Sequence, residues 1–248
     1  MTCYYCGDIL NKKNKSVEHI IPNAIGGKKK AYNLLCQSCN MGFGQTIDYV
    51  LAKQLGRFGY LLNIPLDRGE HKKYSTPDST AFPGEMIPGG IDYHRAIAKI
   101  GLTYYLSKGH QRQYCNKVKA FVKGESNEPI FHYYFPSNEV VHHLEEDEVS
   151  HVIHICGSKE IGALYAYVEL FNMENIIIIF SMDYDGEEIN NTYARDVVKN
   201  IDLVKSIELR LARHHLEHLQ NTGTEMRRKL RVRSERLLGI IESLQSKS

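Results

Sequence analysis

The 248-residue sequence has no hydrophobic run long enough to cross a membrane. Its longest aliphatic run, NIIIIF at residues 175–180, falls far short of the roughly 20 residues that a spanning helix needs. The first ten residues, MTCYYCGDIL, do not show the basic and then apolar pattern of a secretory signal. Internal repeats and low-complexity tracts are also missing. We therefore expect a cytoplasmic protein with no membrane partner.

The net charge of +2 is small, but the charge is unevenly distributed along the chain. Residues 1–60 carry eight Lys or Arg against three Asp or Glu, a local charge of +5. A hydrophobic content of 42% supplies enough apolar material for a core, so bulk disorder is not expected. A basic lobe on a nearly neutral protein predicts that a polyanion binds to this lobe.

The chain divides by composition into two parts and a connection. Residues 63–90 are rich in Pro, Gly, Asp and Ser and show little periodicity, which is typical of a long connecting segment. We expect a small module over residues 1–62 and a larger α+β domain, of unknown role, over residues 91–248.

The larger domain shows both strand and helix patterns. A helix is predicted to open near Asp92, which is a suitable N-cap. Four segments rich in aromatic and β-branched residues predict an antiparallel meander, although the third is equally compatible with a helix. They are PIFHYYF (129–135), HVIHIC (151–156), ALYAYVELF (163–171) and NIIIIFSM (175–182).

Apolar residues recur with helical spacing from Ala194 to the end of the chain. Residues 221–224 interrupt this pattern and predict a turn between two C-terminal helices. Amphipathic helices of this kind can form a dimer interface, so a homo-oligomer is one expected assembly.

Two C-x2-C pairs, separated by 29 residues, form the strongest metal-binding pattern in the sequence. Two thiolates can bind one ion from a tight turn, and two such turns complete the tetrahedral shell of a structural Zn²⁺. The metal would add on the order of 10 kcal/mol to the stability of a lobe too small for a large core. Four unconnected thiols are the alternative. The expected ligands are Cys3, Cys6, Cys36 and Cys39.

The stretch SVEHIIPNAIGG, residues 16–27, lies between the two pairs, with Asn33 further along and Asn40 directly after the last cysteine. This arrangement resembles the HNH endonucleases, whose ββα-metal motif runs from Asp or Glu followed by His, through an Asn, to a His or Asn in a short helix. The resemblance covers residues 3 to about 50. It implies an α+β protein in which a zinc-stapled ββα-metal module precedes a mixed domain with an antiparallel meander and C-terminal helices.

The motif residues suit phosphodiester hydrolysis, which needs a base to deprotonate water and a metal beside the phosphate. His19 is the expected base because its neutral imidazole is available near pH 7. Glu18 offers a carboxylate oxygen and Asn40 a carbonyl oxygen, which are ligands that Mg²⁺ or Mn²⁺ accepts. Neighbouring strand residues point in opposite directions, so Glu18 and His19 are expected to address one phosphate from two sides.

Other residues of the motif have supporting roles. The resemblance implies that Asn33 steadies the loop that carries the base. Gly26 and Gly27 permit a tight turn. Asp48 either adds a ligand through a water or is an ordinary surface or capping residue. Lysines beside the turn are expected to meet DNA phosphates. These lysines are Lys28, Lys29 and Lys30.

The sequence therefore predicts a metal-dependent DNA endonuclease of the HNH type. A role in bacterial restriction or anti-phage defence is the expected setting, with an ATPase or sensor subunit as a further partner. A zinc-ribbon module that binds nucleic acid without cutting it is the alternative, because the cysteines and lysines alone would suffice for binding.

Overall fold

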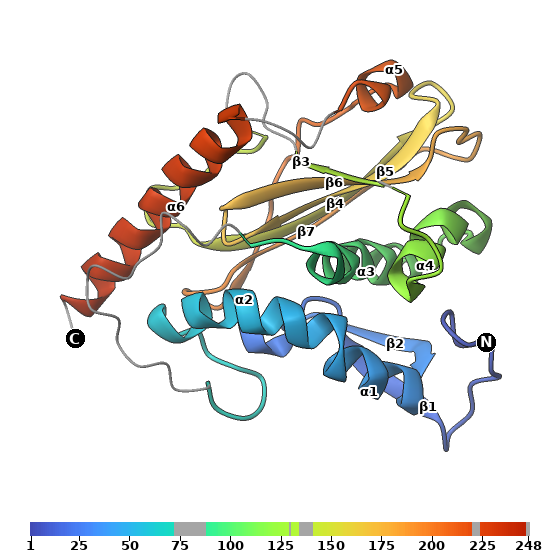
Figure 1. The fold of residues 1–248 in the computed structure, drawn as a ribbon, viewed down its shortest axis with the longest axis horizontal. Helices are drawn as coiled ribbons and strands as arrows, with labels where there is room; N and C mark the ends of the chain where they lie inside the picture. Colours follow the sequence, from blue (N-terminus) through green and yellow to red (C-terminus); the bar gives the residue numbers. More distant parts are fainter. Residues whose placement is uncertain (72–87, 129, 134–140, 220–223, 247–248) are drawn as a thin grey trace.

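The computed structural model describes residues 1–71, 88–128, 130–133, 141–219 and 224–246. Figure 1 shows the N-terminal hairpin and its helices on one side of α3 and a large antiparallel sheet on the other. The predicted α+β class and the antiparallel meander are confirmed.

The N-terminal module is a β-hairpin followed by two consecutive helices. A short 3-10 turn lies in the hairpin loop, and the strands pair antiparallel, with His19 opposite Lys30 and Glu18 opposite Ala31. The elements are β1 (Lys15–His19), η1 (Asn23–Ile25), β2 (Lys30–Cys36), α1 (Gln37–Gln45) and α2 (Ile47–Leu61).

The two glycines of the hairpin loop are required by close packing. Gly26 has φ +89°, and a Cβ there would lie 2.6 Å from the side chain of Ile64. A Cβ at Gly27 would lie only 1.8 Å from the carbonyl oxygen of Ile21. The loop therefore folds tightly only because both positions lack a side chain.

The sheet has the strand order β3-β6-β5-β4-β7-β8, and all neighbouring strands are antiparallel. β4, β5 and β6 are almost fully buried, because α3 and α4 cover one face and a second apolar cluster covers the other. The strands are β3 (Phe131–Tyr133), β4 (Ser150–Ser158), β5 (Ala163–Leu170), β6 (Glu174–Ser181), β7 (Ile189–Asp196) and β8 (Ile201–Leu203).

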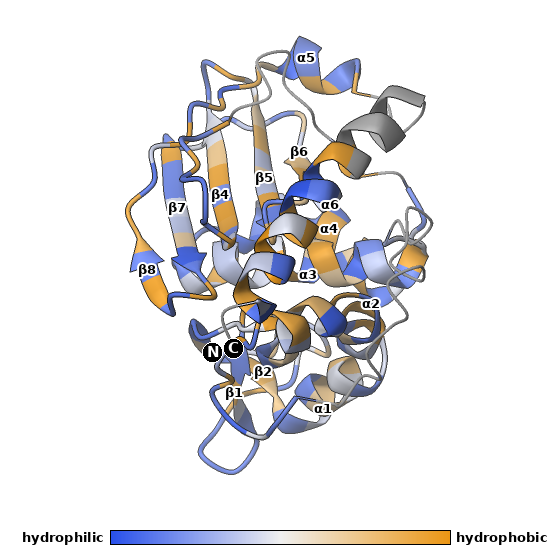
Figure 2. Ribbon diagram, turned by 90° about the vertical axis from the view of Figure 1, so that its left-hand side faces the viewer, coloured by the Kyte–Doolittle hydropathy of each residue, from blue (hydrophilic) through white to orange (hydrophobic). Residues whose placement is uncertain are grey.

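Helix α3 (Ile91–Ser107) is the central element of the molecule. It forms where the helical pattern predicts, but Gly90 is its N-cap and Asp92 lies in the first turn. It is buried along nearly its whole length. Figure 2 shows it between the module and the sheet. Gly101 allows this close packing, since a Cβ there would lie 3.1 Å from Ala166. Two shorter elements follow it, η2 (Arg112–Cys115) and α4 (Asn116–Lys123).

The predicted helix from Ala194 onward is wrong. Ala194 lies in β7, which pairs with β4, and the chain then turns into β8. The Asp196 carboxylate accepts hydrogen bonds from the backbone of Val198 and Lys199, and Asn200 has φ +58°. This turn chemistry outweighs the helical spacing of the apolar residues.

Of the two predicted C-terminal helices, the one before the break is much shorter than expected, and the one after the break forms as expected. Between Ala194 and residue 219 the one helix that forms is α5 (Arg213–Glu217), whereas α6 (Thr224–Gln245) follows the helical pattern. The turn predicted at 221–224 lies almost entirely outside the described residues. No helix in the described part of the chain is both long and apolar enough to cross a membrane.

The module and the rest of the protein share one hydrophobic core. Leu51 and Leu55 of α2 are fully buried in the same cluster as the residues of α3 and of the sheet. Ile64, just beyond residue 62, is also buried in it. The packing therefore continues across the boundary that composition suggests. The division into residues 1–62, 63–90 and 91–248 stays a prediction.

Candidate functional site

The four paired cysteines converge on one point. Their sulfur atoms all lie within 4.8 Å of one another, and Cys6 Sγ and Cys36 Sγ are 3.8 Å apart. Zn–S bonds of about 2.3 Å in a tetrahedron give sulfur separations of about 3.8 Å. All four thiols are free of disulfides. The residues Cys3, Cys6, Cys36 and Cys39 thus fit a structural Zn²⁺ in type and spacing.

Local backbone structure presents the sulfurs. Gly7, with φ +85°, closes a turn in which its N–H donates to the Cys3 carbonyl at 3.0 Å. Cys36 is the N-cap of α1, and its sulfur accepts from the Cys39 N–H at 3.5 Å. The first turn of α1 is therefore part of the cysteine cluster.

Asn40 follows the cluster directly and fastens α1 to the hairpin. Its Nδ2 donates to the Val17 carbonyl oxygen at 3.3 Å. That bond uses the Nδ2 atom and not Oδ1, and Oδ1 is the atom of Asn40 that could bind a cation.

His19 lies at the end of β1 with its side chain 11% exposed. Its Nε2 is 3.0 Å from Oδ2 of Asp67, and the same oxygen is 2.6 Å from Nζ of Lys30. Burial lowers the pKa of His19, which favours the neutral imidazole, while the contact with Asp67 opposes that shift. Hydrogen bonds from Lys30 and His19 lower the pKa of Asp67 to about 2.

Glu18 points away from His19 and into the core. Its carboxylate is 4% exposed and forms an ion pair with Lys99 of α3. Burial raises the pKa of Glu18, and the neighbouring ammonium group of Lys99 opposes this rise. The strand alternation is as predicted, but Glu18 and His19 contact different partners. Assignment of Glu18 and Asn40 as ligands of a catalytic cation stays a prediction.

Asp48 joins the same buried group. Its Oδ2 is 3.0 Å from Lys99 Nζ, so one ammonium group faces both Asp48 and Glu18. Lys99 Nζ also lies 5.1 Å from the centre of the Phe43 ring. The oxygens of Glu18 and Asp48 suit Mg²⁺ in type, but in this arrangement both carboxylates are paired with one lysine. A cation at Glu18 would have to share the carboxylate with Lys99 or displace it.

Asn33 has φ +58° and lies where the register of the hairpin shifts. It lines an open pocket together with Lys30 and Arg112. The side chain of Asn23 fastens the loop after the base through hydrogen bonds with the backbone of Asp67 and Arg68. The supporting role that the resemblance implies for Asn33 stays a prediction.

Two of the three lysines of the loop contact protein groups. Lys30 pairs with Asp67, and Lys29 lies with its Nζ 4.9 Å from the centre of the Tyr193 ring. Burial lowers the pKa of Lys28, and the nearby Arg195 acts in the same direction. Binding of DNA by these lysines stays a prediction.

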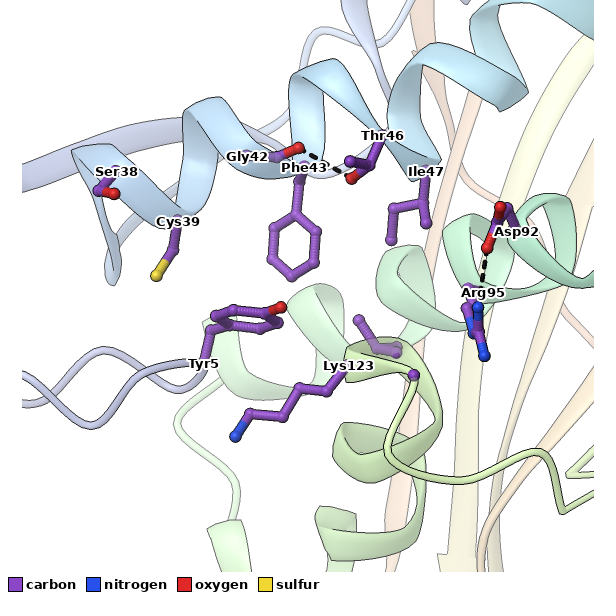
Figure 3. A pocket seen from close by; sticks show the side chains of 12 residues that line it. Tyr5, Ser38, Cys39, Gly42, Phe43, Thr46, Ile47, Asp92, Arg95 and Lys123 are labelled. Carbon is purple, nitrogen blue, oxygen red and sulfur yellow. Dashed lines mark hydrogen bonds and ion pairs between the residues drawn. The ribbon is translucent and has the colours of Figure 1, made fainter.

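A pocket of about 420 Å³ lies next to the cysteine cluster, between the start of the chain, α1 and α4. Figure 3 shows Phe43 pointing from α1 toward the Tyr5 ring, with Lys123 on the other side of that ring. Arg95 at its edge is paired with Asp92. Neither His19 nor Glu18 lines it, so this pocket is separate from the predicted catalytic residues.

Three residues that sequence reasoning missed complete the site. Asp67 contacts the expected base, and Lys99 contacts the expected metal ligand. Asn23 fastens the hairpin loop to the backbone of Asp67 and Arg68. Asp67 and Lys99 lie outside the motif and had no signal of their own. Asn23 directly follows Pro22 and is a common loop residue, so composition alone gave it no role.

A cysteine-clamped hairpin followed by a short helix, with a histidine at the end of the first strand, defines a ββα-metal module. The family model of the HNH endonucleases matches residues 3–56, which confirms the resemblance. This segment is similar to the HNH endonucleases, while residues 57–248 lie outside the match. Neither the curated proteins nor the solved structures gave a significant match.

Proposed function

We propose that the protein is a metal-dependent DNA endonuclease that hydrolyses phosphodiester bonds. The observation that carries the proposal is the position of His19. It stands at the strand end of a cysteine-clamped HNH module, with a neutral imidazole and one ring nitrogen in contact with a carboxylate.

The chain's own residues supply the base and the positive charge. His19 accepts a proton from the attacking water, and the basic loop at residues 28–30 meets the phosphates. A divalent cation, Mg²⁺ or Mn²⁺, would stabilise the charge that develops on the phosphate and the leaving oxygen. Glu18 and Asn40 are the residues proposed to hold it, and binding at Glu18 competes with the ion pair to Lys99.

Plasmid nicking tests the proposal. Zinc-loaded wild type with Mg²⁺ or Mn²⁺ should convert supercoiled plasmid to the nicked form, and His19→Ala should lose this activity. His143→Ala is the matched control, because His143 is an exposed histidine whose side chain pairs with Glu145, two residues away. If wild type fails to nick DNA with every divalent ion, alone and with its partner subunit, the proposal is wrong.

A non-catalytic zinc-ribbon module is the second candidate, and the enclosure of Glu18 favours it. A metal-ligand carboxylate that is 4% exposed and paired with Lys99 is compatible with a purely structural role. In that case wild type, His19→Ala and Glu18→Ala would bind DNA equally and none would cut it. Salt weakens binding in both cases, so salt dependence does not separate the two functions.

We further propose a cytoplasmic role in bacterial restriction or anti-phage defence, in which the chain acts with an ATPase or sensor subunit. Residues 57–248 lie beyond the nuclease match and offer a large surface for a homo-oligomer contact or for such a subunit. Phage plating on cells that express the protein and its neighbouring genes tests this role. Protection should vanish with His19→Ala. If cells that express His19→Ala are still protected from phage, the proposed defence role is wrong.

A further inference from the structure

Asp67 lies outside the segment that matches the HNH endonucleases, yet its carboxylate contacts the expected base. The Oδ2 atom of Asp67 is 3.0 Å from Nε2 of His19 and 2.6 Å from Nζ of Lys30. His19 and Lys30 are opposite each other in the hairpin. One oxygen therefore binds the paired residues at the ends of both strands.

The backbone around Asp67 is held by the loop that follows the base. Asn23 uses both ends of its amide: Oδ1 accepts from the Asp67 N–H at 2.8 Å, and Nδ2 donates to the Arg68 carbonyl at 2.9 Å. Ile64, three residues earlier, is buried against Gly26. The Nε2 atom of His71 is 2.6 Å from the Ile64 carbonyl oxygen. Asp67 is thus fixed by the contacts of its segment with Asn23 and Gly26 and by the contact between His71 and Ile64 on either side of it.

The shared oxygen decides which ring nitrogen of His19 carries hydrogen. An ionised carboxylate only accepts hydrogen bonds, and the ammonium group of Lys30 keeps Asp67 ionised. The nitrogen that faces it, Nε2, must therefore be the protonated one. The lone pair of the neutral ring is then on Nδ1.

We propose that Asp67 is a positioning residue that holds His19 in the Nε2–H tautomer, so that Nδ1 is the atom that takes the proton from water. The proposal rests on the nuclease function proposed above. Water gives a proton to Nδ1 as its oxygen bonds to phosphorus, the bond from phosphorus to the leaving oxygen breaks, and that oxygen takes a proton from solvent. Asp67 meanwhile stabilises the imidazolium that forms, without accepting its proton.

The test uses two substitutions of the full-length chain. Asp67→Ala removes the acceptor, whereas in Asp67→Asn the amide oxygen can still accept from both His19 and Lys30. Lys30 favours the orientation in which the Asn amide oxygen faces it, because in the flipped orientation the amide N–H groups would face the ammonium group. Glu70→Ala is the matched control, since it removes one carboxylate from the same segment, three residues on.

Nitrogen-15 NMR of the histidine rings gives the first readout, which does not depend on activity. Wild type and Asp67→Asn should show the His19 ring proton on Nε2 and protected from solvent exchange, and Asp67→Ala should lose this protected signal. A ring proton on Nδ1 in wild type, or an unchanged protected signal in Asp67→Ala, would overturn the proposal.

DNA nicking gives the second readout. Asp67→Ala should lower the rate at saturating DNA on the order of 10-fold or more, as loss of a group that orients a catalytic ligand commonly does. KM should change little, Asp67→Asn should stay closer to wild type, and Glu70→Ala should match wild type. Full activity of Asp67→Ala would overturn the positioning role. If wild type does not nick DNA, the proposed function fails, and the NMR result still decides the role of Asp67.

Discussion

At the scale of single residues, Lys99 joins the N-terminal module to α3. Its ammonium group is buried, is paired with Glu18 and Asp48, and has a raised pKa because those two carboxylates outweigh its desolvation. A buried ion pair contributes little relative to an apolar replacement of the whole group, but loss of one partner leaves an uncompensated charge. The stability of the module therefore depends on this one side chain.

Lys99→Met should destabilise the protein by about 3–5 kcal/mol, since it leaves two carboxylates without their cation. Urea unfolding of the zinc-loaded chain measures the change. Lys53→Met is the control: Lys53 is exposed on α2, and its substitution should change stability by less than about 0.5 kcal/mol. A Lys99→Met protein as stable as wild type would show that Glu18 and Asp48 do not depend on Lys99.

At the scale of secondary-structure elements, His151 joins the loop of the HNH module to the sheet. It lies in β4, its Nε2 is 2.8 Å from the Ile25 carbonyl oxygen in η1, and its Nδ1 accepts from the Phe171 N–H at 3.1 Å. Both ring nitrogens are used by a neutral imidazole in one tautomer. Protonation would place two N–H groups against each other, so acid should loosen this contact.

Stability should therefore fall as the pH is lowered. Burial lowers the pKa of His151 to about 4, although the nearby Glu169 carboxylate acts in the opposite direction. Because the unfolded chain takes up the proton near pH 6.5, the contribution is complete above that pH and is lost toward pH 4, by on the order of 1 kcal/mol per unit.

Urea unfolding between pH 7.5 and 5 measures this effect. His94 and His154, whose pKa values burial also lowers to about 4, give slopes of the same sign. The comparison is therefore between wild type and His151→Gln, which lacks the titrating ring and should show a shallower slope. Equal slopes in the two proteins would contradict the role of His151.

The sequence predicted local features well and long-range contacts poorly. The cysteine clamp, the HNH motif and the start of α3 depend on short spacings that a sequence displays directly. From Ala194 the apolar spacing predicts a helix where the end of β7 and β8 form, because the pairing of β7 with β4 is not visible in that spacing. The contacts of Asp67 with His19 and of Lys99 with Glu18 join residues far apart in the chain, and each involves a common charged residue.

At the scale of the whole molecule, one core and one metal cluster are expected to act together. The cysteine cluster joins the start of the chain to the hairpin and α1, and Leu51 and Leu55 of α2 are buried in one core with α3. We therefore expect the module to depend on both the ion and the helix.

Removal of the metal should unfold the module. Wild type should contain one zinc per chain by elemental analysis, and Cys36→Ser should contain much less and lose helical circular dichroism. Cys115→Ser is the control, because Cys115 lies in η2, outside the cluster. A Cys36→Ser protein that keeps a full equivalent of zinc would contradict the assignment of the four cysteines.

The most direct test of the account is cleavage of a linear DNA duplex by the zinc-loaded chain with added Mg²⁺ or Mn²⁺, followed by analysis of the new ends. Wild type should leave a 5′-phosphate and a 3′-hydroxyl, and His19→Ala should leave the duplex intact while it keeps its zinc and its fold. Cleavage by His19→Ala at the wild-type rate would contradict the central claim that this histidine is the base of an HNH nuclease.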